Sequence, residues 1–191
     1  MGDIPPAAQA VLDFWFSLEK PGPRHDEQVR ERLGGWHARA LAGELDGWAR
    51  APRARLALVL LLDQVPRHIF RELPRAYAGD ARAQALTARF LERADWEDFT
   101  PLERYYAAAP WLHAEDAAMQ ARIHPVLRAL AAGHPALAVS AAVADLYLET
   151  IRRFGRFPHR NAILGRESTA EERAFLAGEW AERRRAMYRE E

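Results

Sequence analysis

The sequence predicts an all-α protein, with about seven to nine helices in a single helical domain over residues 1–191. Apolar residues recur at helical spacing along nearly the whole chain, and no segment alternates convincingly with a period of two. Prolines and capping residues stand where helices would begin, and Gly155 stands where one would end. A chain of 191 residues is long enough for one core and too short to expect two.

Two helices are expected near the start of the chain. Pro5 and Pro6 suit the first turn of the first helix, and apolar side chains at helical spacing follow as far as Leu18. Pro21 and the residues after it would end that segment. Asp26 then predicts the cap of a second helix, which runs to about Gly43.

The segment from Arg53 to Val65 is predicted to be the central helix. Its residues 56–62 are all apolar, as expected for a helix that is buried on every side. A buried strand is the rival interpretation, but Pro52 fits a first helical turn and the polar flanks make the segment too long for a typical strand. Pro66 is expected to break the helix, because proline lacks an amide hydrogen and disfavours helical backbone at Val65.

Start and stop signals predict five further helices. They are expected from Asp80 to about Ala94, from the capping box Thr100–Glu103 to Pro110, from Glu115 to Ala132 with a kink at Pro125, from Pro135 to Phe154, and from the capping box Thr169–Glu172 to about Arg189. No repeat of about 34 residues recurs with fixed Trp, Gly, Tyr and Pro positions. The helices could therefore stack as a short superhelix or pack as an irregular bundle.

Composition excludes several classes of partner. Twenty-six Arg and the single Lys20 balance 27 acidic residues, so no net charge attracts nucleic acid or an anionic membrane, and neither is an expected partner. The first residues lack a secretory signal pattern, and no apolar stretch reaches the roughly 20 residues of a membrane span. A cytoplasmic location is therefore expected. The absence of Cys removes thiolate chemistry and Cys-ligated zinc.

Residues 152–166 are the most unusual stretch, because they hold five Arg and one His and no acidic residue. The guanidinium groups of Arg156, Arg160 and Arg166 could grip a phosphate or carboxylate, with His159 as a proton carrier. These residues predict an anion site. A structural interpretation stays open beside it, in which the same Arg side chains cap helix ends and pair with buried acids.

A second group of polar residues follows the central helix, at Asp63 and Arg67. A carboxylate in the last turn of a buried helix is disfavoured by the helix dipole and by burial, so Asp63 needs a cation close by. Arg67, Arg71 or an Arg of the 156–166 stretch could supply one. The pair would form a structural lock or a ligand-binding dyad, and for Asp63 alone we favour the lock.

A third group comprises His113 and Glu115, with Gln120 nearby in the sequence. Pro110 suggests a helix junction at which such side chains can converge. A metal site through His113, Glu115 and His159 is conceivable, but the chain lacks the His-Glu-x-x-His spacing and any Cys. We therefore predict no metal and no cofactor.

Three segments together resemble a known family. Residues 61–71, 110–120 and 153–169, preceded by the Asp-Phe-Trp-Phe run at residues 13–16, look like those of the bacterial domain of unknown function 924 family. The resemblance covers nearly the whole chain, and the Arg-Phe-Gly-Arg-Phe-Pro-His-Arg-Asn run is highly specific. It implies an all-helical, tetratricopeptide-like fold, and it implies no activity, because the family has none assigned.

This chain departs from the family pattern at three positions. His68 stands where the family usually has Asn, Met119 where it has Asp, and Tyr147 where it has His. If the family site is catalytic, the missing His and Asp could reduce or redirect the activity of this chain. A binding role would tolerate the changes better.

The resulting hypothesis is a polar pocket formed by the loops between helices. Its candidate catalytic residues are His159 or His113 as general acid/base, with Asp63 or Glu115 orienting the His. Its candidate ligand-binding residues are Arg67, Gln120, Arg156, Arg160, Asn161 and Arg166. The leading prediction is the binding of an anionic small molecule or acidic peptide. The alternatives are an enzyme that uses His as general acid/base with Arg stabilising negative charge, and a protein-interaction domain with the motif as an internal lock.

Overall fold

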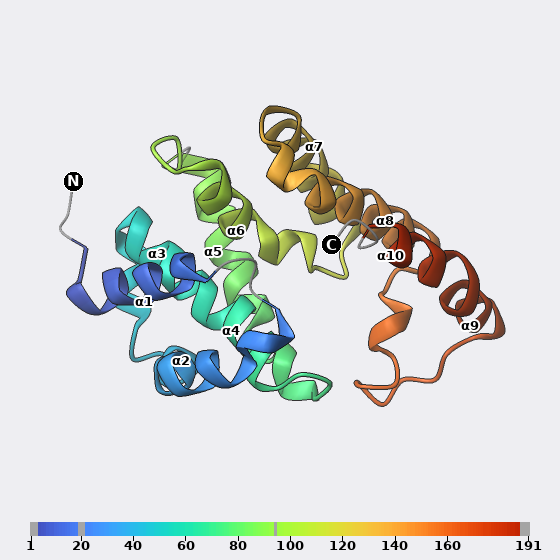
Figure 1. The fold of residues 1–191 in the computed structure, drawn as a ribbon, viewed down its shortest axis with the longest axis horizontal. Coiled ribbons are helices and arrows are strands. Elements are labelled where there is room, and N and C mark those ends of the chain that lie inside the picture. Colours follow the sequence, from blue (N-terminus) through green and yellow to red (C-terminus); the bar gives the residue numbers. More distant parts are fainter. Residues whose placement is uncertain (1–3, 19–21, 94, 188–191) are drawn as a thin grey trace. The chain divides into compact units, whose positions relative to one another are not determined.

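The computed structural model describes residues 4–18, 22–93 and 95–187 (Figure 1). Within these ranges the chain forms helices and no strand, which confirms the all-α prediction. Two helices each contain a π-helical turn, and if each is counted once the described residues form eight helices, as expected. The chain divides into two compact units, Met1–Pro110 and Trp111–Glu191.

The first unit contains the helices predicted before residue 110. They are α1 (Pro6–Ser17), α2 (Asp26–Leu41), α3 (Pro52–Val59), α4 (Val65–Ile69), α5 (Asp80–Arg93) and α6 (Pro101–Leu112), of which the last runs past the boundary. The predicted capping box of α6 is present, because the Thr100 N–H donates to the Glu103 carboxylate at 2.8 Å and the Glu103 N–H to the Thr100 hydroxyl at 3.3 Å.

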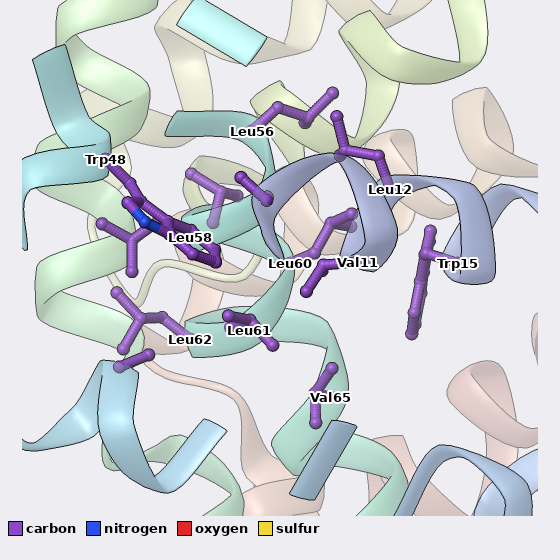
Figure 2. Packing of buried hydrophobic residues seen from close by; sticks show 14 of the residues in the cluster. Val11, Leu12, Trp15, Trp48, Leu56, Leu58, Leu60, Leu61, Leu62 and Val65 are labelled. Atoms are coloured by element: carbon purple, nitrogen blue, oxygen red, sulfur yellow. The ribbon is translucent and has the colours of Figure 1, made fainter. Parts of the chain in front are cut away.

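The central helix is buried as predicted, and the rival strand interpretation is wrong. Residues 54–63 are all buried, and Figure 2 shows Leu56 and Leu60 packed beside Val11 and Leu12 of α1. This all-round burial explains why residues 56–62 lack a polar face.

The prediction that Pro66 breaks the central helix is wrong. A π-helical turn at Leu60–Gln64 joins α3 to α4, in which Pro66 lies within the first turn. The wider π-helical turn leaves one backbone carbonyl without its usual intrahelical donor, so the helix continues although Pro66 has no amide hydrogen. The Leu61 carbonyl instead lies 2.7 Å from Nδ1 of His37. The Val65 N–H, one residue before Pro66, donates to the Leu60 carbonyl and closes the wider π turn.

The second unit holds the remaining helices. They are α7 (Ala117–Gly133), α8 (Ala138–Phe154), α9 (Ala170–Phe175) and α10 (Ala181–Met187), with a π-helical turn at Leu176–Trp180 between the last two. Helices α7 and α8 pack along each other (Figure 1). The predicted end of α8 is confirmed, because Gly155 adopts φ 68° in the left-handed region, where glycine has no steric penalty.

None of the helices in the described part of the chain has the length and apolar character that crossing a bilayer requires.

Candidate functional site

The loop between α8 and α9, residues 155–169, carries most of the predicted site and has a defined conformation. Pro158–Arg160 form one 3-10 turn, and the Arg166 N–H closes a wider turn by donating to the Asn161 carbonyl at 2.8 Å. Gly165 has φ 66°, a conformation that residues with a Cβ rarely adopt. The loop therefore holds its arginines in fixed positions.

Glu115 fixes one side of this loop. Its carboxylate accepts hydrogen bonds from Arg166 at 2.7 Å and 2.8 Å, and from the Phe157 N–H at 2.7 Å. Burial alone would raise the pKa of Glu115, but Arg166 and the Phe157 N–H outweigh burial and hold that pKa below its usual value. Glu115 is therefore a charged anchor for the loop.

Glu172 fixes the other side from the first turn of α9. Arg156 donates to its carboxylate at 2.7 Å and 2.9 Å, and Asn161 Nδ2 donates to it at 3.2 Å. The Thr169 N–H also donates at 2.8 Å, within the capping box that the sequence predicted. The hydrogen bonds from Arg156, followed by those from Thr169 and Asn161, lower the pKa of Glu172 to about 2.

His159 lies in an aromatic cluster. Its ring stacks on Trp180 with centroids 4.5 Å apart, and Phe157 and Tyr147 lie at 5.3 Å and 6.0 Å. Burial lowers the pKa of His159 to about 3, with further lowering by the charges of Arg160 and Arg184. The ring is therefore neutral at pH 7.

Arg160 belongs to the same region of the second unit. It is buried, and its guanidinium carbon lies 4.5 Å from the centroid of the Phe157 ring. Its charge lowers the pKa values of both His159 and Glu115. His113 is also close enough to lower the pKa of His159. His113, Glu115 and Arg160 thus all lie near His159 within this unit. The predicted pocket also included Asp63 and Arg67, which belong to the first unit.

Several buried polar atoms of the predicted site have no hydrogen-bond partner among the described residues. They are Gln120 Oε1, His159 Nδ1, Asn161 Oδ1 and Arg166 Nε. The other end of the Gln120 side chain is used, because its Nε2 donates to the carbonyls of Leu112 at 2.6 Å and Ala114 at 3.0 Å. Unsatisfied buried polar atoms are uncommon in native proteins and mark places where a ligand or water can bind.

Asp63 and Arg67 belong to the first unit and form their own cluster with Asp80. Arg67 lies 3.1 Å from the carboxylate of Asp63 and 3.0 Å from that of Asp80. Gln64 Nε2 donates to the Asp63 carboxylate at 2.6 Å. Burial alone would lower the pKa of Arg67, but the charges of Asp63 and Asp80 outweigh it and raise that pKa. These contacts support the lock interpretation for Asp63.

The surroundings of the candidate catalytic residues bear on proton transfer. A His with a pKa near 3 is a weak base and is almost entirely unprotonated at pH 7, while Glu115 and Asp63 both lie in ion pairs. No group of three metal-ligating side chains occurs among the residues that the structure describes. The positions with unpartnered atoms could hold a polar group of a ligand.

Two residues of this region were missed from the sequence. Trp180 covers His159 from the π-helical turn before α10, and Arg184 of α10 contributes positive charge. Trp180 could have been suspected, because a large aromatic side chain in the middle of the predicted last helix needs a partner to cover its ring. Arg184 could not, since it is one of three consecutive arginines at residues 183–185.

The structure shows what contacts each of the three residues that depart from the family pattern. Tyr147 lies in the aromatic cluster and stacks on Trp180 with ring centroids 5.9 Å apart. A His at this position would lie beside His159. His68, in the first unit, contacts the carboxylate of Asp26 through Nδ1 at 2.8 Å, and the Met119 N–H donates to the Asp116 cap of α7.

The fold and this cluster together define an all-α protein in which two arginine–glutamate pairs hold a polar loop. The model of the family described as "Bacterial protein of unknown function (DUF924)" matches residues 7–179, so the chain belongs to this family. It is also similar to the solved structure of the protein of unknown function ATU0120 from Agrobacterium tumefaciens, with 34% identity and a TM-score of 0.78. That match covers 89% of this chain and 96% of the other. Among curated proteins, no match was found.

Proposed function

We propose that the second unit binds an anionic small molecule or an acidic peptide beside His159. The observation that carries this proposal is the unpartnered Nδ1 of His159, which is buried beside two positive charges, those of Arg160 and Arg184. A neutral imidazole in a positive environment can donate a hydrogen bond to an anion, and the anion would offset the charge of the guanidinium groups.

The arginines of the loop would divide into two roles. Arg156 and Arg166 hold the loop through Glu172 and Glu115, so we assign them to positioning. Arg160 and Arg184 would attract the ligand, and the unpartnered amide oxygens of Gln120 and Asn161 would accept hydrogen bonds from its N–H or O–H groups. The proposed ligand therefore does not contact all five Arg side chains of residues 152–166.

The two arginine–glutamate pairs favour a second candidate function. In it the Arg motif is an internal lock, and the domain binds a protein partner elsewhere on its helices. The enzyme alternative has weaker support, because His159 with a pKa near 3 would be a poor general acid or base at neutral pH.

We also propose a tetratricopeptide-like stacking of helix pairs. Its support is the packing of α7 against α8, which are joined by a connection of only four residues, 134–137. An experimental structure in which successive pairs do not stack side by side would contradict it.

The binding proposal is tested by thermal unfolding and calorimetric titration with inorganic phosphate, nucleotides, dicarboxylates and acidic peptides. A ligand at 100 times its dissociation constant stabilises by about 2.7 kcal/mol, which raises the melting temperature by roughly 5–11 °C. Arg184→Ala should remove most of this shift. Arg185→Ala is the matched control, because Arg185 is the next residue of α10 and is exposed.

Arg160→Ala distinguishes the two candidate functions. Under the binding proposal it abolishes the ligand-induced shift and leaves a folded protein. If none of the probes shifts the wild type, and Arg160→Ala mainly lowers its melting temperature, the binding proposal is wrong and the lock is favoured.

A further inference from the structure

A pocket in the first unit lies outside the site described above. It has a volume of about 240 Å³ and lies between α5 and residues 46–58. Helix α5 lines it with Arg82, Leu86 and Arg89, which share one face of the helix because they are spaced by three and four residues. A volume near 240 Å³ suits a small metabolite, since pockets for drug-sized ligands begin near 300 Å³.

The floor of this pocket is apolar and is part of the core. Leu58 is 1% exposed, Leu86 is 8% exposed and Ala49 is 9% exposed. Ala85, on the rim, is exposed and has only a methyl group to contribute. A hydrocarbon group placed here would be removed from water against side chains that are already packed in position.

Two arginines line the polar side of the pocket, and only Arg82 is held by hydrogen bonds within the described part of the chain. Arg82 donates to the carbonyls of Ala40 and Leu41 at the end of α2, and to the carboxylate of Asp46, which it neutralises. Arg89 lies two helical turns further along α5 and is exposed, with no hydrogen bond or ion pair to any residue that the structure describes. Its guanidinium is available for a bidentate contact with a carboxylate.

We propose that this pocket binds a small amphipathic carboxylate, with its hydrocarbon part on Leu58 and Leu86 and its carboxylate on Arg89. The inference is independent of the proposed function, because none of its residues belongs to the second unit. A cationic ligand is disfavoured because Asp46 is already paired with Arg82 and the remaining charge of the lining is positive.

The probes are hexanoate and benzoate, and hexylamine serves as the probe of opposite charge. Titration of the ¹³C-labelled protein should shift the methyl signals of Leu58 and Leu86 with both carboxylates and not with hexylamine. Arg89→Gln should weaken the carboxylate affinity about tenfold, as expected for the loss of one charge-assisted contact. Arg93→Gln should not change it, because Arg93 lies on the same helix outside the pocket.

A second variant tests the cavity without touching buried residues. Ala85→Phe places a ring in the pocket from its exposed rim, so it should abolish the methyl shifts while the protein stays folded. Equal affinity in the wild type and Arg89→Gln, shifts that survive Ala85→Phe, or no shift with either carboxylate at millimolar concentration would each overturn the proposal.

Discussion

Glu115 and Arg166, 51 residues apart in the sequence, form a bidentate ion pair, with Arg166 Nη1 2.7 Å from Oε2 and Nη2 2.8 Å from Oε1. The same carboxylate accepts from the Phe157 N–H. Both side chains are 25% exposed, so the pair lies in a less polar environment than a surface ion pair. It connects the start of the second unit to the loop that carries His159.

We predict that Glu115→Gln lowers the stability of the protein by about 2 kcal/mol, because charged hydrogen bonds are lost and the guanidinium stays partly buried. That loss corresponds to a melting temperature roughly 4–8 °C lower. Glu44→Gln is the control, since Glu44 pairs with Arg39 at the exposed surface, where such pairs contribute about 0–1 kcal/mol. Equal effects of the two variants would show that Glu115 is not an anchor.

Acid stability should depend on Glu172. Its pKa is about 2 in the folded protein and near 4.5 in an unfolded chain, so its contribution is fully present above pH 4.5 and is lost as the pH falls toward 2. Glu172→Gln should destabilise the protein at pH 7 by about 3 kcal/mol. Denaturant unfolding of both proteins at several pH values should show this difference shrinking between pH 4.5 and 2. Glu171→Gln, which alters an exposed residue of the same turn, should have little effect at any pH.

His159 should make the protein less stable in mild acid. Its pKa is lowered from 6.5 to about 3, so the unfolded state binds a proton that the folded state does not, and stability falls as the pH drops from about 6.5 toward 3. His159→Phe keeps a ring against Trp180 and removes the titration, so its stability should decline less over this range. Denaturant unfolding between pH 7 and 4 measures the slope. His134→Asn, at an exposed position, should keep the wild-type slope.

Gly79 should tolerate no side chain. A Cβ at this position would lie 2.4 Å from the carbonyl oxygen of Leu62, inside the π-helical turn that carries Asp63. Gly79→Ala should therefore lower the stability by about 1–3 kcal/mol through forced backbone shifts. Gly34→Ala provides the contrast, because a Cβ there meets nothing within 4 Å and alanine favours helix α2 by about 0.5–1 kcal/mol. Thermal unfolding should give shifts of opposite sign, and a neutral Gly79→Ala would contradict the close approach.

The helices could be predicted because their signals are local. Thr100 with Glu103 and Thr169 with Glu172 form capping boxes as their spacing indicates, and Gly155 ends α8. The prediction that Pro66 breaks the central helix was wrong for a reason that its neighbours in the sequence do not reveal. The rule that proline breaks a helix assumes a regular α-helix, whereas the π-helical turn before Pro66 lets the helix continue without its amide hydrogen.

The candidate site was predicted only in part. The sequence indicated that the arginines of residues 156–166 need anionic partners, and it left open whether these belong to a ligand or to the protein. Glu172 and Glu115 are those partners for Arg156 and Arg166, at separations of 16 and 51 residues. Nothing in the spacing of the chain indicates such pairs, because they depend on how whole helices pack.

The sequence by itself determined the helical class, most helix boundaries and the membership of a family, because propensity, capping and apolar periodicity act over a few residues. Tertiary structure alone decided which charges neutralise one another and which polar atoms are buried without a partner. It covered His159 with Trp180 and lowered the pKa of that His. The physical reason is that burial and Coulomb interactions depend on distances in space, and residues far apart in the chain set those distances.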